Sequence, residues 1–312
     1  MRPKTRISYV VRDKQNQRHT AGIAAIKAGD GRLSSAGRDG TVVTWDLHLD
    51  SKTTLRPTID RCFDHHTAGI NDIALQDSKI LTASSDRSIY LINQQNGVSA
   101  LIGCHQDYVK RVCFASNNHA VSGGFDERIN IWDLATATKV MSFSNESASN
   151  ASIYALCCVP NGNLIASGSP DKLIRLWDSR EATRSHTLVG HSDIVRDLII
   201  SHDGQYLLSA SSDATVKLWS LSMMRCLKTY SHSEDSVFCL SSNSPTLDTF
   251  WSGSKDGWVF KVGREDNNCI AVCREISPVF QVLYTSPKIT VTSDILFAAT
   301  KSSNINCWVP TF

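Results

Sequence analysis

The residues from Gly190 to Leu221 alternate short apolar runs with polar turns, and this pattern predicts three β-strands. The runs are Ile194 to Ile200, Tyr206 to Ala210 and Thr215 to Trp219, separated by a His-Asp-Gly turn and a Ser-Ser-Asp turn. Three short strands joined by turn residues within about thirty residues are typical of one blade of a β-propeller. Since one blade cannot bury its own faces, the pattern should recur along the chain.

The pattern does recur, and it is marked by a turn aspartate followed six residues later by tryptophan or another apolar residue. The pairs are Asp39 and Trp45, Asp86 and Ile92, Asp126 and Trp132, Asp171 and Trp177, Asp213 and Trp219, Asp256 and Val262, and finally Ser302 and Trp308. A serine or threonine lies four residues before most turn positions: Ser35, Thr82, Ser122, Ser167, Ser209, Ser252, and Ala298 in the last copy. Each copy opens on His19, His66, His105, Ser149, His191, Ser233 (with His232 one residue earlier) or Glu275.

This spacing, with Gly-His at the start and tryptophan near the end, resembles the WD40 repeat, whose period is about 40 to 45 residues. The resemblance implies an all-β WD40 β-propeller that occupies residues 1–312 as a single domain. The expected repeats span approximately residues 19–58, 66–97, 105–144, 149–185, 191–230, 232–270 and 275–309.

Residues 6–11 alternate in polarity and predict one further strand ahead of the first repeat. The last repeat stops at Trp308-Val309-Pro310, directly after its third strand. We therefore expect residues 6–11 to supply the missing fourth strand, which closes a ring of seven blades and removes an open sheet edge. The alternative is that the chain is a fragment of an eight-bladed ring.

Composition narrows the class of partner. Hydrophobic residues make up 41% of the chain, and its formal net charge is +2, which gives no general attraction to nucleic acid or acidic membranes. The first residues lack the apolar stretch of a secretory signal, and no run approaches the roughly 18 apolar residues of a membrane span. Cysteines fall on predicted inner strands, where they act as small apolar residues: Cys113, Cys157, Cys158 and Cys239. We expect reduced thiols, no metal, no cofactor, and a cytoplasmic and nuclear location.

The regular blades each hold a histidine, a serine or threonine, an aspartate and a tryptophan. Serine, histidine and aspartate together are also the components of a hydrolase triad. A set that recurs in blade after blade, without a G-x-S-x-G motif, favours a structural role and a protein that is not an enzyme. The WD40 resemblance implies hydrogen-bonded tetrads, which we predict for His191, Ser209, Asp213 and Trp219 and for His105, Ser122, Asp126 and Trp132. Blades with Ile92, with Val262, or without the turn aspartate should be more plastic.

One face of the ring should carry the residue after the first buried position of each inner strand and the residue before each turn aspartate. The first series is Ala24, Asn71, Lys110, Tyr154, Arg196, Phe238 and Phe280, and the second is Arg38, Ser85, Phe125, Pro170, Ser212, Lys255 and Lys301. Exposed aromatic and basic residues are typical of protein-binding hot spots. We expect a binding face for an acidic or mixed partner at Lys110, Tyr154, Arg196, Phe238 and Lys255. Alternatively, some of these rings turn into the central channel.

Several segments are individual rather than general to WD40 repeats. They are Lys4 to Asp13, Ser35 to Asp39, Asn71 to Ile73, Ala83 to Asp86, Asp107 to Lys110, Ser167 to Ser169, Leu176 to Arg180, Leu218 to Leu221, and Arg225-Cys226. Together they resemble the WD repeat-containing protein 48 family, the activating partners of ubiquitin-specific proteases, over residues 4 to about 309.

The resemblance implies a non-catalytic cofactor that binds a deubiquitinase through the propeller and raises its turnover, with ubiquitinated substrates as further partners. Arg196, Phe238 and Lys255 stand at family positions that are basic, aromatic and basic. Family proteins are longer, with a further repeat, an ancillary region and a ubiquitin-like C-terminal domain.

Two other functions stay open. Trp177-Asp-Ser-Arg180 fits the W-D-x-R box through which substrate receptors dock on cullin-RING ligases. The fold also suits a general protein-assembly scaffold. Substitution of Arg180, compared with substitution of Arg196 and Phe238, distinguishes the ligase receptor from the deubiquitinase activator.

Overall fold

The structure is a computed structural model that describes residues 5–11, 19–29, 32–49, 55–144, 152–181, 184–265, 269–275, 277–285, 295–301 and 305–310. These residues form β-strands joined by turns and short loops, without a helix in any of the ranges. It follows that none of the described segments is a helix long and apolar enough to cross a membrane.

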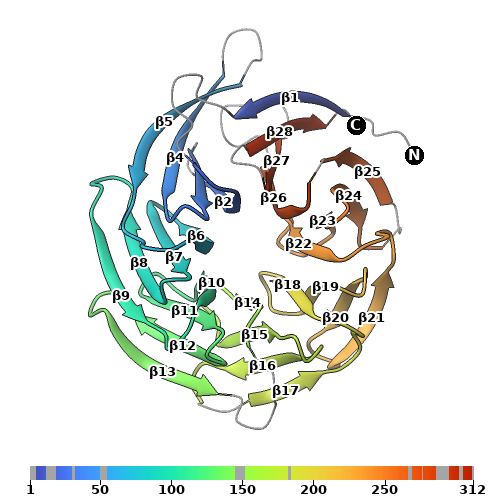
Figure 1. The fold of residues 1–312 in the computed structure, drawn as a ribbon. Coiled ribbons are helices and arrows are strands. Elements are labelled where there is room, and N and C mark those ends of the chain that lie inside the picture. The colour runs from blue at the N-terminus through green and yellow to red at the C-terminus, as the bar shows by residue number, and fades with distance from the viewer. Residues whose placement is uncertain are drawn as a thin grey trace.

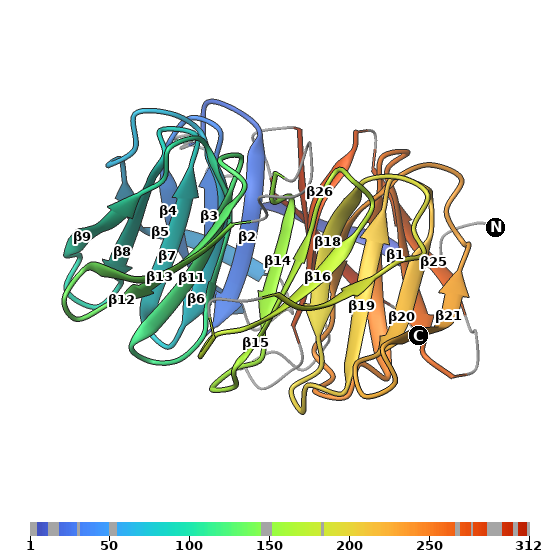
Figure 2. The same cartoon turned by 90° about the horizontal axis from the view of Figure 1, so that it is seen from below.

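The described strands form seven four-stranded antiparallel sheets arranged around a central axis, as Figure 1 shows. We number the sheets as blades in chain order, from blade 1 (β2 to β5) to blade 7 (β26, β27, β28 and β1). The strands nearest the axis are β2 (Ile23–Gly29), β6 (Ile70–Gln76), β10 (Val109–Phe114), β14 (Ala155–Cys158), β18 (Val195–Ile200), β22 (Val237–Ser241) and β26 (Val279–Thr285). Turned by 90°, the ring is seen from its rim, with the blades side by side around it (Figure 2).

The remaining strands of each blade lie progressively farther from the axis. The second strands are β3 (Arg32–Gly37), β7 (Lys79–Ser84), β11 (His119–Gly124), β15 (Leu164–Gly168), β19 (Tyr206–Ser211), β23 (Thr249–Ser254) and β27 (Ile295–Thr300). The third strands are β4 (Val42–Leu49), β8 (Ser88–Asn93), β12 (Arg128–Asp133), β16 (Ile174–Asp178), β20 (Val216–Ser220), β24 (Trp258–Gly263) and β28 (Ile305–Pro310). The outer strands are β5 (Leu55–Phe63), β9 (Ser99–Cys104), β13 (Thr138–Ser144), β17 (Arg184–Leu188), β21 (Arg225–Tyr230), β25 (Cys269–Arg274) and β1 (Thr5–Val11).

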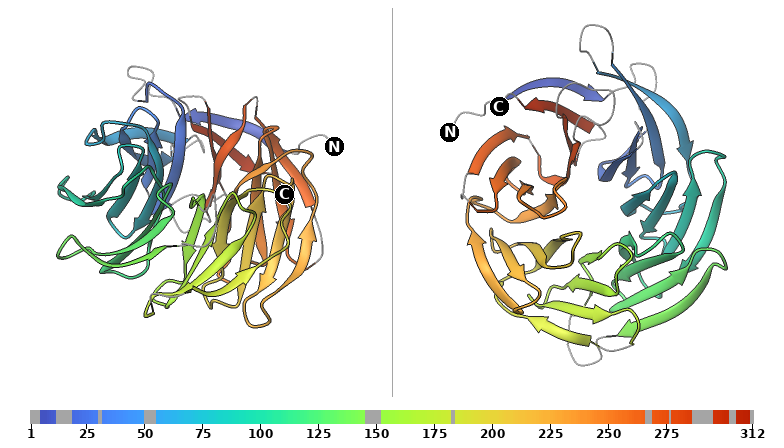
Figure 3. Two further views of the ribbon diagram at one scale, coloured as in Figure 1. Left: turned by 60° about the horizontal axis from the view of Figure 1, so that its bottom comes forward. Right: turned by 180° about the vertical axis from the view of Figure 1, so that it is seen from behind.

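The N-terminal strand completes the last blade, and this confirms the predicted closure. β1 pairs antiparallel with β28, with Thr5 opposite Pro310 and Val11 opposite Ile305. Both views in Figure 3 show β1 lying along the outside of β28. Blades 7 and 1 pack directly on each other through one buried cluster: Ile23, Ile26, Leu33, Val43, Trp45, Phe297, Ala299 and Ile305. The seven described sheets therefore form a closed ring.

The outer strands extend past the predicted repeats in four blades. β17 ends at Leu188 and β25 at Arg274, beyond the expected ends at residues 185 and 270. β9 occupies Ser99–Cys104, beyond the expected end of the second repeat at residue 97, and β5 continues to Phe63, beyond residue 58. Their side chains explain the difference, because an outer strand faces solvent along much of its length. In β9 only Ile102 is buried, so the strand has almost no hydrophobic pattern to read.

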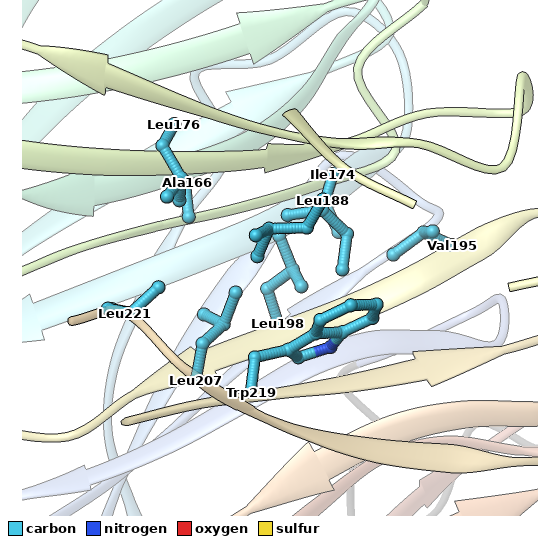
Figure 4. Packing of buried hydrophobic residues seen from close by; sticks show 10 residues of the cluster. Ala166, Ile174, Leu176, Leu188, Val195, Leu198, Leu207, Trp219 and Leu221 are labelled. Carbon is cyan, nitrogen blue, oxygen red and sulfur yellow. The ribbon is translucent and has the colours of Figure 1, made fainter. Parts of the chain in front are cut away.

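The core is divided among the contacts between neighbouring blades. Figure 4 shows the cluster between blades 4 and 5, where the Trp219 ring faces Ile174 and Leu188 from the preceding blade. Trp219 is 1% exposed and Leu207, from the next strand of the same sheet, is fully buried. Each blade thus buries its flat faces against two neighbours, which is why an isolated blade cannot be stable.

Candidate functional site

The two predicted tetrads are brought together by hydrogen bonds within their blades. In blade 5, His191 Nδ1 lies 2.8 Å from Asp213 Oδ2 and His191 Nε2 lies 2.6 Å from Ser209 Oγ, while Trp219 Nε1 donates to Ser209 Oγ over 2.8 Å. In blade 3, the corresponding distances are 2.9 Å for His105–Asp126, 2.6 Å for His105–Ser122 and 2.7 Å for Trp132–Ser122. The histidine and serine are buried in each set. A hydroxyl held between an imidazole and an indole inside a sheet serves to fix the turn.

Blade 1 repeats this arrangement in full, and blade 2 lacks only the tryptophan. His19, Asp39, Ser35 and Trp45 form the set in blade 1. In blade 2, Ile92 takes the place of tryptophan and is 1% exposed, so that its packing is retained without an indole donor.

Blade 4 holds its turn aspartate with an arginine in place of a histidine. Arg175, which is 2% exposed, donates from Nη1 to Asp171 Oδ1 over 3.1 Å, while Trp177 Nε1 donates to Ser167 Oγ over 2.9 Å. The predicted opening residue of this repeat, Ser149, lies outside the described residues, as do Ser302 and the side chain of Trp308.

Blade 6 corrects the predicted register by one residue. His232, rather than Ser233, approaches Ser252, with Nε2 and Oγ 2.7 Å apart. The turn aspartate Asp256 accepts hydrogen bonds from Ser254 Oγ and the Trp258 backbone nitrogen instead, and His232 Nδ1 is buried without a partner. Burial without a carboxylate lowers the pKa of His232 to about 4.

A β-bulge at the start of the inner strand determines which residue faces the mouth of the channel in every blade except blade 4. The pairing of β10 with β11 passes from Val109 to Arg111 and leaves Lys110 unpaired between them, and the pairing of β18 passes from Val195 to Asp197 in the same way. The bulged residues in six blades are Ala24, Asn71, Lys110, Arg196, Phe238 and Phe280. Tyr154 lies directly before β14. A bulge re-aims a side chain, and the six bulged residues line one cavity together with Tyr154, so that it holds all seven residues of the first predicted series.

Aromatic and basic side chains around this mouth form a chain of contacts, each touching the next, and we call this group the belt. The belt consists of Tyr108, Phe125, Tyr154, Arg196, Phe238, Phe280 and Arg38. Phe125 stacks on Tyr154 with centroids 5.2 Å apart and planes 17° apart. The Arg196 guanidinium lies 5.6 Å from the Tyr154 centroid and 5.3 Å from that of Phe238. Such cation–π contacts hold the guanidinium in place while leaving its edge free to bind.

The cavity inside the belt has a volume of about 200 Å³. It is lined by Ala24, Arg38, Asn71, Lys110, Arg111, Tyr154, Arg196, Phe238 and Phe280. Tyr154, Arg196 and Phe238 are half-buried. The predicted alternative, in which rings turn toward the channel, therefore describes the side chains better than an open rim does.

Arg111 forms the floor of the cavity, and the sequence pattern did not single it out. Its Nη2 lies 3.1 Å from Asp197 Oδ1, and its Nη1 lies 3.7 Å from Asp72 Oδ1. Its Nε donates to the Tyr154 carbonyl oxygen over 3.1 Å. Arg111 also lines a second cavity of about 620 Å³ on its other side, so this side chain divides the channel. The sequence did contain a signal for this contact. Asp72, Arg111 and Asp197 each directly follow the bulged residue of their strand, so that oppositely charged residues occupy equivalent positions in three blades.

Lys110 is the cation that burial affects most. It is half-buried in the cavity wall, and burial, together with the charges of Arg111, Arg38 and Arg196, lowers its pKa to about 8, while Asp72 opposes the shift. Positive charges therefore raise the electrostatic potential in the cavity.

Lys255 lies apart from the other four residues of the predicted binding face. Its ammonium is exposed and lies 3.5 Å from Asp235 Oδ2, and it does not line the cavity. The geometry thus groups Lys110, Tyr154, Arg196 and Phe238 and leaves Lys255 on the outer surface.

A family model for the WD40 repeat, described as "WD domain, G-beta repeat", matches residues 58–93, 98–133, 138–178 and 182–220. Each matched segment begins in the outer strand of one blade and continues through three strands of the next. The chain is a WD-repeat propeller. In this WD-repeat propeller, β1 and the first three strands of blade 1 follow the same order: an outer strand of one blade, then three strands of the next. The pairing of β1 with β28 therefore joins blades 7 and 1 in the way that the other blades are joined.

WD-repeat propellers are generally non-catalytic scaffolds, and the tetrads fit that role because each is sealed within its own sheet. Nine cysteines whose side chains the structure describes are free, and the described residues contain no group of three or more side chains placed to bind a metal ion. The WD-repeat propeller is suited to protein interaction, and the belt is its candidate interface.

Proposed function

We propose that this WD-repeat propeller binds a ubiquitin-specific protease over the belt and raises the turnover of that enzyme without taking part in its chemistry. The resemblance of the segments quoted above to the WD repeat-containing protein 48 family supports this choice of partner. The observation that carries the proposal is the belt itself, in which Arg196 is held between Tyr154 and Phe238. Pre-positioned aromatic and arginine side chains bind with little loss of entropy, which is characteristic of hot spots.

The proposed partner surface is acidic or mixed in charge, because the mouth carries several cations. Arg38 is exposed, its guanidinium carbon lies 4.8 Å from the Phe280 centroid, and it lines the same cavity as Lys110. A partner that covers the mouth would desolvate these charges, and complementary charges then give specificity and fast association.

The test is turnover of a ubiquitin-based fluorogenic substrate by a candidate ubiquitin-specific protease, with and without this chain. We expect the chain to raise turnover, and we expect the double variant Arg196→Glu, Phe238→Ala to lose the effect. Lys139→Glu is the matched control, since Lys139 is exposed on the outer strand β13. Thermal unfolding of each variant separates loss of binding from misfolding. Equal activation by the wild type and the folded double variant would remove the belt from the interface.

A second candidate, a substrate receptor of a cullin-RING ligase, is favoured by the position of Arg180. Its side chain is 67% exposed and makes a two-pronged ion pair with Asp178, with Nη2 and Oδ2 2.6 Å apart and Nε and Oδ1 3.0 Å apart. β16 begins after the Asp171 turn at the belt side and ends at Asp178, so Arg180 lies on the opposite side of the ring. If Arg180→Ala abolishes capture of a ligase adaptor while the belt variant retains it, the receptor function replaces the activator.

A further inference from the structure

The cavity inside the belt is unusually one-sided in charge. Four basic residues line it, namely Arg38, Lys110, Arg111 and Arg196, and none of the described residues that line it is acidic. Asp72 and Asp197 do not line this cavity, and both form ion pairs with Arg111. After that pairing the cavity wall still presents the other three cations.

These three cations differ in how firmly they are held. Arg196 donates from Nε to Ser212 Oγ over 2.7 Å and lies between two rings, which leaves its terminal nitrogens for a ligand. Arg38 is fixed by its contact with Phe280. Lys110 is held less firmly. Within the described part of the chain, only burial and neighbouring charges act on its pKa, and no hydrogen bond does. A half-buried ammonium without a counter-ion is a costly arrangement, and an anion in the cavity would offset that cost.

The charge and size of the cavity select among anions. A carboxylate supplies one negative charge, whereas a phosphate monoester carries about −1.5 to −2 at neutral pH and presents three acceptor oxygens. Two arginines with planar donor edges and one lysine match three such oxygens better than two. With a volume of about 200 Å³, the cavity is large enough for a phosphoryl group and part of its carrier.

We propose that this cavity is a binding site for a phosphate monoester, held by Lys110, Arg196 and Arg38 above the floor formed by Arg111. The inference deepens the proposed function and rests on it for the source of the group, a phosphorylated serine or threonine of the docked partner. Tyr154 and Phe238 contact the carrier, and the phosphoryl group lies at the axis of the ring.

Isothermal titration calorimetry of the full chain with N-acetyl-O-phosphoserine methylamide tests the site. We expect binding, no binding of the unphosphorylated serine amide, and weaker binding of the glutamate amide. Lys110→Met and Arg196→Gln should each weaken binding by about tenfold, as expected for removal of one charge-assisted contact. Lys255→Met is the matched control, because Lys255 is a nearby cation outside the cavity, and its affinity should equal that of the wild type.

Inorganic phosphate distinguishes the two sources of the group. Tighter binding of the phosphoserine amide assigns the site to a phosphorylated side chain, and equal binding of inorganic phosphate assigns it to a free anion. A second measurement needs no variant: amine acylation read by mass spectrometry should show Lys110 protected by the phosphoserine amide and Lys255 unprotected.

Three results would overturn the proposal. They are an absence of binding heat, equal affinity for the phosphoserine and glutamate amides, and equal losses in Lys110→Met and Lys255→Met. The calorimetry uses no protein partner, and the protease assay uses no phosphorylated ligand. Failure of the phosphate site therefore leaves docking over the belt standing, and failure of docking leaves the phosphate site standing.

Discussion

Arg111 and Asp197 form an ion pair between blades that are not neighbours, with Nη2 of the arginine on β10 3.1 Å from Oδ1 of the aspartate on β18. Blade 4 lies between their sheets, and Arg111 bridges it by donating to the Tyr154 carbonyl oxygen. Asp197 Oδ2 in turn accepts from the Leu240 backbone nitrogen of blade 6 over 2.8 Å. A single guanidinium thus ties together the inner strands of several blades around the channel.

Replacing Arg111 by methionine should destabilise the propeller strongly. The substitution leaves Asp72 and Asp197 buried without their cation, and loss of one partner of a buried pair costs about 3–5 kcal/mol. Denaturant unfolding monitored by tryptophan fluorescence measures the change. The triple variant Arg111→Met, Asp72→Asn, Asp197→Asn should recover part of the loss, because no uncompensated charge remains. An Arg111→Met protein as stable as the wild type would show that the pair has no structural role.

Replacing Trp219 by phenylalanine should cost about 1–3 kcal/mol, because Ser209 loses an indole donor and a void remains beside the ring. The matched variant is Ile92→Val at the equivalent position of blade 2, where no donor exists, and it should cost about 0.5–1.5 kcal/mol. Thermal and denaturant unfolding give both values. Similar losses in the two variants would mean that packing, and not the tetrad hydrogen bond, determines the contribution of this position.

His232 should make the propeller less stable as the pH falls from about 6.5 toward 4. Burial lowers its pKa from 6.5 to about 4, so the unfolded chain binds a proton in this range that the folded chain does not. The stabilisation is fully present above pH 6.5 and is lost as the pH falls toward the folded pKa. Burial also lowers the pKa of His66, which acts in the same direction.

The measurement for His232 is the free energy of unfolding at several pH values between 7.5 and about 4 for the wild type and His232→Gln. The variant should show a smaller dependence on pH, because one buried, titratable ring has been removed. A dependence that survives the substitution unchanged would assign it to other groups.

Removal of β1 should open the ring at blade 7. Without residues 5–11, the backbone groups of β28 along Ile305–Pro310 lose their partners, and an unpaired strand edge favours association. We expect a lower melting temperature and larger species in size-exclusion chromatography with light scattering. A synthetic peptide of residues 5–11 added in excess should reverse both effects. A monomeric truncated chain with the wild-type melting temperature would contradict the closure role of β1.

Binding of inorganic phosphate to the proposed site should weaken as the pH rises through about 8. Burial lowers the Lys110 pKa to about 8, the charges of Arg111, Arg38 and Arg196 act in the same direction, and Asp72 opposes them. Only the protonated ammonium attracts the anion, so its contribution is present below this pKa and is lost above it. Titration calorimetry at pH 7 and at pH 9 measures the change, and Lys110→Arg should remove most of it, because arginine stays charged. A wild-type affinity that is constant over this range would exclude Lys110 from the site.

Sequence periodicity was sufficient to predict the ring, its closing strand and the tetrad positions. The evidence for each of these lies within one repeat or in its comparison with the next, as for His191, Ser209, Asp213 and Trp219. Blade 6 shows where this fails: His232 and Ser233 are adjacent candidates, and only the fold decides that His232 reaches Ser252. The outer strand β9 was also missed, because a solvent-facing strand has little hydrophobic pattern.

The sequence by itself determined which residues stand at equivalent positions, because a repeated strand pattern places the same register at the same height in every blade. It therefore predicted the residues around the channel mouth. Only the tertiary structure decided how these side chains interact. The bulges turn Lys110 and Arg196 into the channel, and ring curvature brings Arg111 to Asp197. Contacts between blades depend on how the sheets pack around the axis, and no local sequence pattern records that geometry.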